Sequence, residues 1–187
     1  GFDRRSRRRL VRSKLGQLRT GIVMKIARVT SNKQGETDRL LTGIAALLQK
    51  DGFALAGIVK DLHHVSRFEN GCDMKVKVLP DGPIIQITQN LGAGSDACRL
   101  DPSAIADAVT QVENGALDDA DLFILNKFGP EEVAGRGFIS AIGRAVQKGV
   151  PVLVGVSGPS CVSFDAFADG LADELADDRA ALEAWGR

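Results

Sequence analysis

The stretch that decides the fold is Lys25–Lys50, KIARVTSNKQGETDRLLTGIAALLQK. Its first residues, Lys25–Thr30, predict a strand, and the polar residues Ser31–Gly35 predict a turn. From Glu36 onward the leucines and isoleucine recur at helical spacing until Asp51-Gly52, which ends the helix. A strand, a short turn and an amphipathic helix are the opening of an α/β fold.

The rest of the chain repeats this alternation. Apolar runs at Phe53–Val59, Asp121–Leu125 and Val150–Val156 are typical of strands that are covered on both faces. Two further runs, Met74–Leu79 and Pro83–Thr88, flank a turn and predict a β-hairpin. Because strands alternate with helices, we predict a three-layer α/β domain with a mainly parallel sheet and an inserted hairpin. The other predicted helices are Asp101–Glu113, with Asp101 as N-cap, then Glu131–Lys148, Val162–Ala168 and Leu171–Trp185.

Composition narrows the functional class. The chain has 187 residues, 44% hydrophobic and 26% charged, which suits one globular domain. No apolar run approaches the ~20 residues that span a bilayer, and no secretory signal is recognisable. Three cysteines without CxxC spacing indicate reduced thiols, so we expect a cytoplasmic protein without a metal site. The two histidines, His63 and His64, are expected in a solvated loop.

Charge is distributed unevenly along the chain. Residues 1–23 hold eight Arg or Lys and one acid, Asp3, so this segment is +7 and the remainder −7. A basic arm of this kind is suited to nucleic acid or an anionic membrane. The alternative is an extension ahead of a natural start at Met24. We expect residues 1–23 to lie outside the core and 24–187 to form a single domain, with nucleic acid as partner only through the arm.

Parallel sheets bind ligands beyond the carboxyl ends of their strands. The segments to search for chemistry are therefore those that follow the predicted strands, although one of them follows the hairpin instead of a parallel strand. They are Thr30–Thr37, Gln89–Asp101, Asn126–Arg136 and Ser157–Ser160.

The first of these loops resembles the phosphate-binding pattern GxxxxGK[ST] in context and in part of its sequence. Gly35 and Thr37 fall in register, but Glu36 stands where the phosphate-binding lysine belongs. A carboxylate ~4 Å from a phosphate at an effective dielectric of ~20 costs about 4 kcal/mol. Lys33 is the one basic residue inside the loop and can partly replace the missing charge. Alternatively, Glu36 is only a favourable acid at a helix N-terminus.

The third loop follows strand DLFIL, where P-loop enzymes place the acid that holds magnesium. Asn126 and Lys127 stand there instead. Loss of the lysine from one motif and of the acid from the other is a consistent pair of changes. It indicates either a pseudo-enzyme or a different ligand, unless Asn126 merely caps the strand end.

Three stretches together resemble an uncharacterised bacterial family, domain of unknown function 2478. They are Ile87–Pro102 with Cys98-Arg-Leu-Asp, Asn126–Gly137 with Asn-Lys-Phe-Gly and Gly-Arg-Gly, and Val150–Val156. The resemblance covers roughly residues 24–185. It implies a P-loop-like fold similar to THEP-type nucleoside triphosphatases and genes that often lie near those of molybdenum transport. The THEP-type pattern Asp-Glu-x-Gly-x-x-Glu falls on Asn126, Lys127, Gly129 and Glu132, and only its Gly and last Glu are kept.

The second loop offers further candidate contacts. Its glycines let backbone N–H groups approach an anion, Gln89 lies at its start and Arg99 supplies a fork of donors. Cys98 is a candidate nucleophile, a ligand contact or a packing residue. Arg136, between two glycines, is a candidate anion contact that converges with Arg99. The alternative is local ion pairing, of Arg99 with Asp101 and of Arg136 with Glu132.

These observations favour a protein that binds a nucleotide with magnesium, or an oxyanion such as molybdate, without efficient ATP hydrolysis. The alternative is a divergent nucleoside triphosphatase in which Thr37 and Glu132 support a metal. The partner in either case is a small anionic ligand. The candidate binding residues are Lys33, Gly35, Thr37, Gln89, Cys98, Arg99, Asn126, Lys127, Glu132 and Arg136.

Overall fold

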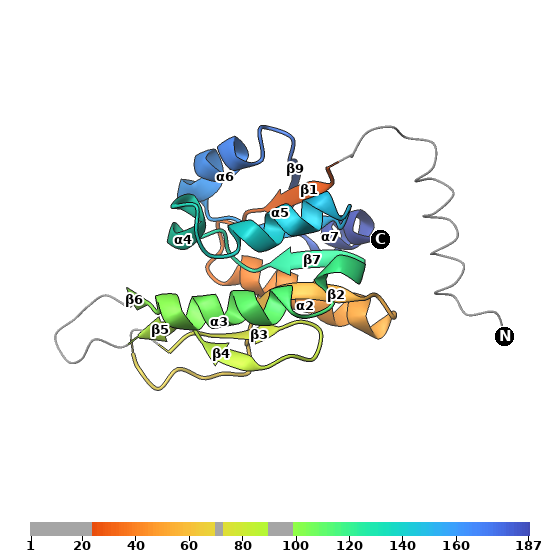
Figure 1. The fold of residues 1–187 in the computed structure, drawn as a ribbon. Helices are drawn as coiled ribbons and strands as arrows, with labels where there is room; N and C mark the ends of the chain where they lie inside the picture. Colours follow the sequence, from red (N-terminus) through yellow and green to blue (C-terminus); the bar gives the residue numbers. More distant parts are fainter. Residues whose placement is uncertain (1–23, 70–72, 90–98) are drawn as a thin grey trace, which may run out of the picture.

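The computed structural model describes residues 24–69, 73–89 and 99–187. The basic segment 1–23 and the glycine-rich residues 90–98, with Cys98, lie outside the described residues. The described chain folds into a mainly parallel β-sheet with helices on both faces (Figure 1). No helix in this part of the chain is long and apolar enough to cross a membrane.

The main sheet of the described residues has the strand order β4-β3-β2-β7-β8-β1-β9. The strands β1, β2, β7, β8 and β9 are parallel, and β3 and β4 continue the sheet antiparallel beside β2. A separate antiparallel pair joins β5 to β6. The strands are β1 (Ile26–Val29), β2 (Leu55–Lys60), β3 (Lys75–Val78), β4 (Ile84–Gln86), β5 (Thr88–Gln89), β6 (Arg99–Leu100), β7 (Leu122–Leu125), β8 (Val152–Gly155) and β9 (Asp173–Leu175).

Helices cover both faces and create two core layers. One cluster packs α2 and α7 against the sheet, and the other packs α3, α5 and α6 against the opposite face. The central strands β7 and β8 are buried along their whole length, as their continuous apolar runs predict. The helices are α2 (Glu36–Lys50), α3 (Pro102–Glu113), α4 (Pro130–Val133), α5 (Ile139–Gln147), α6 (Cys161–Phe167) and α7 (Arg179–Gly186), with 3₁₀ turns η1 (Leu117–Asp119) and η2 (Gly158–Ser160).

The start of α3 follows the sequence prediction. The Asp101 carboxylate accepts hydrogen bonds from the backbone N–H groups of Ser103 (2.9 Å) and Ala104 (3.3 Å), and Pro102 is the first helical residue. The start of a helix can be predicted from an acid followed by proline, because N-capping and the preference for proline at the first helical position are both local effects.

Two predicted helices are wrong. The segment 131–148 divides into α4 and α5, because Gly135 and Gly137 adopt positive φ and a Cβ at Gly137 would collide with the Glu132 carboxylate. The segment 171–185 contains strand β9, which pairs with β1 before α7 begins at its N-cap Asp178. Strand β9 was missed because two of its three residues are acidic and exposed, as is common in edge strands.

The prediction for one of the two histidines is also wrong. His64 is half-buried, and its Nε2 lies 2.9 Å from Oδ2 of the buried Asp73. Asp73 also accepts hydrogen bonds from the Arg67 backbone N–H and the Ser66 hydroxyl, which hold its pKa well below the ordinary range. This cluster fastens the loop that follows β2.

Candidate functional site

The loop between β1 and α2 ends on a left-handed glycine. Gly35 has φ +74°, and its carbonyl accepts the first helical hydrogen bond from the Arg39 N–H at 3.1 Å. No side chain caps the first turn of α2. Helix N-termini without a side-chain cap present backbone N–H groups that suit an anion. Lys33 is exposed and Thr37 half-buried at this end of the sheet.

Glu36, which replaces the expected lysine, is paired within its own helix. The Arg39 Nε donates to a Glu36 carboxylate oxygen at 2.8 Å, and a second guanidinium N–H donates to the other. This bonding with Arg39 lowers the pKa of Glu36. The negative charge of Glu36 at this edge of the sheet is therefore largely compensated by the Arg39 guanidinium. Sequence reasoning missed Arg39, although its spacing of three residues from Glu36 is that of a helical ion pair.

The residues after β7 are fixed against the end of β8. The Phe128 N–H donates to the Gly155 carbonyl at 2.8 Å, and a Cβ at Gly155 would collide with the Asn126 backbone oxygen and press on the Thr37 side chain. Asn126 is buried, whereas the neighbouring Lys127 is exposed. Thr37, Asn126 and Lys127, far apart in sequence, are thus held at one edge of the sheet.

Glu132 serves the backbone of the turn in which it lies. It is buried, and its two carboxylate oxygens accept hydrogen bonds from the N–H groups of Gly129 (2.9 Å) and Phe138 (3.1 Å). Burial raises its pKa, and these two hydrogen bonds offset part of that effect. The carboxylate holds together the turn between α4 and α5. No group of three or more metal-ligating acids, cysteines or histidines occurs among the described residues.

Arg136 pairs with Glu131, and the expected alternative pairing with Glu132 is wrong. Its Nε and one terminal nitrogen donate to the Glu131 carboxylate at 2.9 and 3.2 Å, which lowers the pKa of Glu131. Both side chains line a hollow of about 370 Å³ against α3. The Arg136 side chain remains 65% exposed, so its outer face stays open to solvent.

Gln89 and Arg99 lie opposite each other on the pair β5–β6 and are exposed. The alternative partner for Arg99, Asp101, has its carboxylate engaged as the cap of α3. Arg99 makes no ion pair within the part of the chain that the structure describes. Its convergence with Arg136 on an anion stays a prediction, and Cys98 lies outside the described residues.

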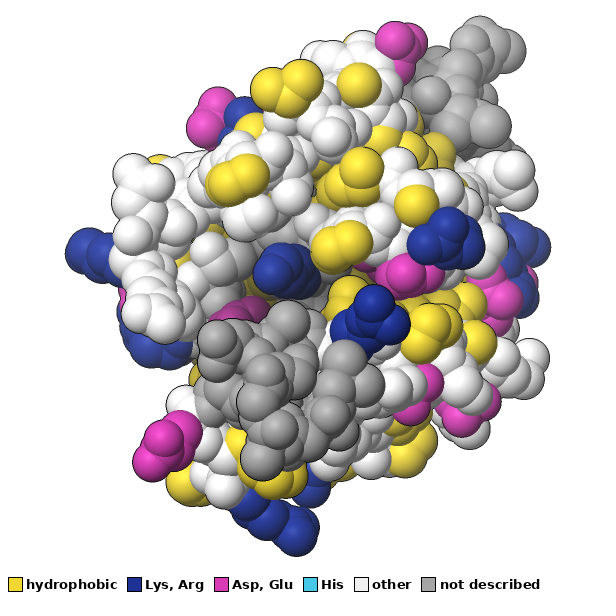
Figure 2. Space-filling view, turned by 90° about the vertical axis from the view of Figure 1, so that its left-hand side faces the viewer, with side chains coloured by type: hydrophobic (Ala, Val, Ile, Leu, Met, Phe, Trp, Pro, Cys, Tyr) yellow, Lys and Arg dark blue, Asp and Glu magenta, His cyan; other side chains and the backbone are white. Residues whose placement is uncertain are grey.

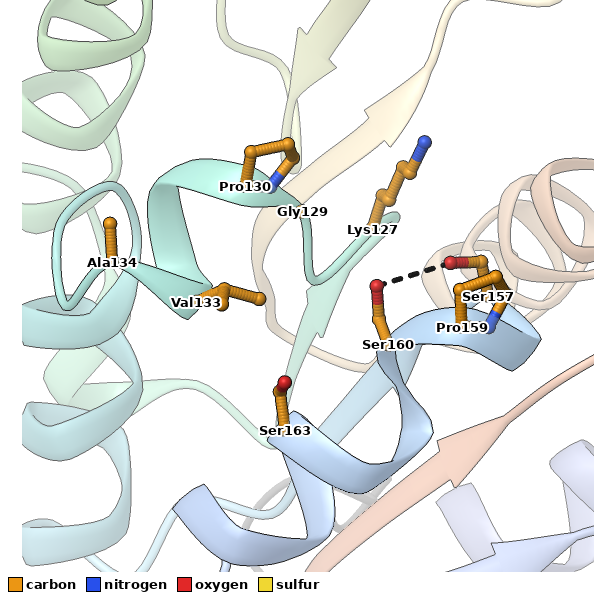
Figure 3. Close-up of a pocket in the computed structure, with 9 residues that line it drawn as sticks. All are labelled: Lys127, Gly129, Pro130, Val133, Ala134, Ser157, Pro159, Ser160 and Ser163. Carbon is orange, nitrogen blue, oxygen red and sulfur yellow. Dashed lines mark hydrogen bonds between the residues drawn. The ribbon is translucent and has the colours of Figure 1, made fainter.

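A larger hollow opens between α4 and α6. It measures about 460 Å³ and combines apolar side chains from α4 with hydroxyl groups from the segment after β8 (Figure 3). Figure 2 shows the end of the molecule that carries α4 and α6, with Lys and Arg side chains beside hydrophobic ones. The lining residues are Lys127, Gly129, Pro130, Val133, Ala134, Ser157, Pro159, Ser160 and Ser163.

The loop 30–37 contacts the segments that follow β8 and β9. The Cys161 Sγ lies 3.5 Å from the Thr30 Oγ1, and the Ser31 hydroxyl donates to Asp177 at 2.7 Å. Sequence reasoning missed Cys161 and Asp177. Cys161 has no neighbouring motif that would identify it, and Asp177 follows the unpredicted strand β9.

The fold and the edge of the sheet define a mainly parallel α/β domain, consistent with a P-loop-NTPase-like fold. The chain belongs to the family described as "Protein of unknown function (DUF2478)", which matches residues 26–185. It is 33% identical over 165 residues to a protein named "Molybdenum import ATP-binding protein ModC 2" from Bradyrhizobium diazoefficiens. That match covers 87% of this chain but 18% of the relative, so most of the relative lies outside it. No solved structure matches the chain.

Proposed function

We propose that this chain binds a nucleotide or an oxyanion such as molybdate at the carboxyl edge of its sheet, in association with molybdenum import. The observation that carries the proposal is that Thr37 and the backbone of Asn126, the residue before Lys127, both lie against Gly155 where β1, β7 and β8 end. Both loops follow parallel strands, where such sheets place ligands. The name of the relative supports the link to ATP binding and molybdenum import.

The loop 30–37 is proposed as a degenerate phosphate-binding loop. It keeps Gly35 in the left-handed conformation and Thr37 in the first turn of α2, but it carries Glu36 instead of lysine. The Glu36–Arg39 pair reduces the repulsion that an anion would meet there. With Asn126 in place of an acid, magnesium lacks a carboxylate after β7, so efficient ATP hydrolysis is not expected.

A divergent phosphohydrolase is the second candidate, since Thr37 keeps the hydroxyl that binds magnesium in P-loop enzymes. The use of both Glu132 oxygens by backbone N–H groups weighs against this role, because a metal would have to displace them. Phosphate release from magnesium-ATP distinguishes the two candidates. We expect background rates, and a robust rate that Thr37→Ala abolishes would favour the enzyme.

The direct test is a thermal-shift panel of nucleotides, tripolyphosphate and molybdate, with and without magnesium. One ligand at 100-fold over its dissociation constant adds ~2.7 kcal/mol of stability. Thr37→Ala should reduce that shift, whereas the matched variant Thr42→Ala, further along α2 and outside both hollows, should leave it unchanged. A panel in which no anion stabilises the protein would contradict the proposal.

A further inference from the structure

The hollow between α4 and α6 is too large for a bare oxyanion alone. Its volume of about 460 Å³ lies within the range of ~300–1,000 Å³ that is typical of pockets for small organic molecules. A tetrahedral oxyanion would leave most of it filled with water. The dimensions therefore favour a ligand with an organic part.

The two walls of the hollow differ in chemistry. Pro130, Val133 and Ala134 form an apolar wall, and Val133 is 51% exposed. Across from them, the hydroxyls of Ser160 and Ser163 point into the gap (Figure 3). An organic group that carries hydroxyls would find both an apolar surface and hydrogen-bonding partners here.

The hydroxyl wall retains donors for a ligand. The Ser160 Oγ accepts a hydrogen bond from Ser157 at 3.2 Å, which leaves the Ser160 proton available. Ser163 extends from α6 one turn further along and lines the same hollow. Two side-chain hydroxyls can therefore bind polar atoms of the same ligand.

A positive charge lies at the rim. Lys127 lines the hollow. It makes no ion pair with any of the residues that the structure describes. The contact between Thr30 and Cys161 places the adjoining wall beside the loop 30–37. A phosphate against Lys127 would lie at the border between the two regions.

We infer that the hollow takes the organic part of a hydroxylated organic phosphate, with its phosphate against Lys127 and its hydroxyls on Ser160 and Ser163. This inference rests on the proposed anion site and deepens it, because it selects an organic phosphate over a bare oxyanion. Val133 forms the apolar contact, and the serines set the specificity.

Isothermal titration calorimetry with ADP, glucose 6-phosphate, tripolyphosphate and molybdate tests the inference. At least one organic phosphate should bind more than tenfold tighter than molybdate. Val133→Gln should weaken that organic phosphate at least tenfold and leave tripolyphosphate within twofold. The matched control is Val162→Gln, since Val162 is 82% exposed and does not line the hollow. It should behave as the wild type with every probe.

The outcomes separate the two proposals. If no anion binds at all, the proposed function fails and this inference with it. If tripolyphosphate or molybdate binds but neither organic phosphate binds tighter, the proposed function stands and the inference is overturned. Equal effects of Val133→Gln and Val162→Gln would also overturn it, because the ligand would then lie outside the hollow.

Discussion

Glu36 and Glu132 occupy two glycine-flanked turns at the same end of the molecule, yet their surroundings are opposite. Glu36 lies in the first turn of α2, and its carboxylate is paired with the largely exposed Arg39. Glu132 is buried, and both of its carboxylate oxygens accept hydrogen bonds from backbone N–H groups of its own turn. Both acids fall in motifs that, in a P-loop enzyme, would handle phosphate and metal.

The difference separates an acid that is held by backbone donors from an acid that is held by a side chain. A buried acid that satisfies two backbone donors is required by the fold, whatever ligand the protein binds. Glu36, whose side chain is 21% exposed and pairs with Arg39, satisfies no such backbone donors in the described part of the chain, so the fold depends on it less. We therefore expect changes at Glu132 to reduce stability and changes at Glu36 to alter ligand binding.

The largest expected effect is on the free energy of unfolding of Glu132→Ala. The change leaves the N–H groups of Gly129 and Phe138 without their acceptor, which costs about 2–4 kcal/mol. Urea unfolding measures it. The neighbouring variant Glu131→Ala removes only the ion pair with Arg136 and should cost less than about 1 kcal/mol. Equal losses in the two variants would contradict the structural role of Glu132.

The next effect is on ligand affinity. Glu36→Lys replaces a carboxylate with the cation that the phosphate-binding pattern requires, so tripolyphosphate should bind at least about tenfold tighter at low salt. Calorimetry at two salt concentrations should show the gain shrink as screening increases. Glu183→Lys is the control, because Glu183 in α7 also pairs with an arginine close in sequence, Arg187, four residues further on. An equal gain in both variants would indicate non-specific attraction.

The smallest expected effect is on the pH dependence of stability, because the pKa values of Glu36 and Glu132 are shifted in opposite directions. The pKa of Glu36 is lowered by Arg39, so its contribution to stability is present above the ordinary glutamate pKa and is lost as pH falls. The pKa of Glu132 is raised by burial, so the folded state holds its proton longer, and its contribution is lost as pH rises through that raised value. Carboxyl-carbon NMR titration should place Glu36 below Glu132, and the reverse order would break the comparison.

Local signals in the sequence predicted the parts of the fold that depend on neighbouring residues. The helix α2, the cap of α3 and the apolar runs of β2, β7 and β8 are such cases. Strand β9 could not be predicted, because it is a strand only through its pairing with β1. The division of 131–148 was hidden for a similar reason, since it depends on Glu132 folding back onto Phe138.

The candidate site followed the same rule. That the loops after β1, β7 and β8 meet was predictable, because parallel strands end at one edge. The pairing of Arg136 with Glu131 instead of Glu132 was not, because it depends on which acid the turn buries. The hollow of α4 and α6 was equally hidden, since its walls come from segments that are joined only through the fold.

The position of β1 in the sheet has a consequence for how the chain folds. Its two neighbours, β8 and β9, follow all the other described strands in the sequence, so Ile26 meets Val152 and Ala27 meets Asp173 only after those strands have been synthesised. Contacts between residues so distant in sequence form slowly because a large loop must close first. Before these pairs form, β1 lacks both of its neighbours in the sheet. The edge that begins with Thr30 is therefore completed only after β8 and β9 have been synthesised.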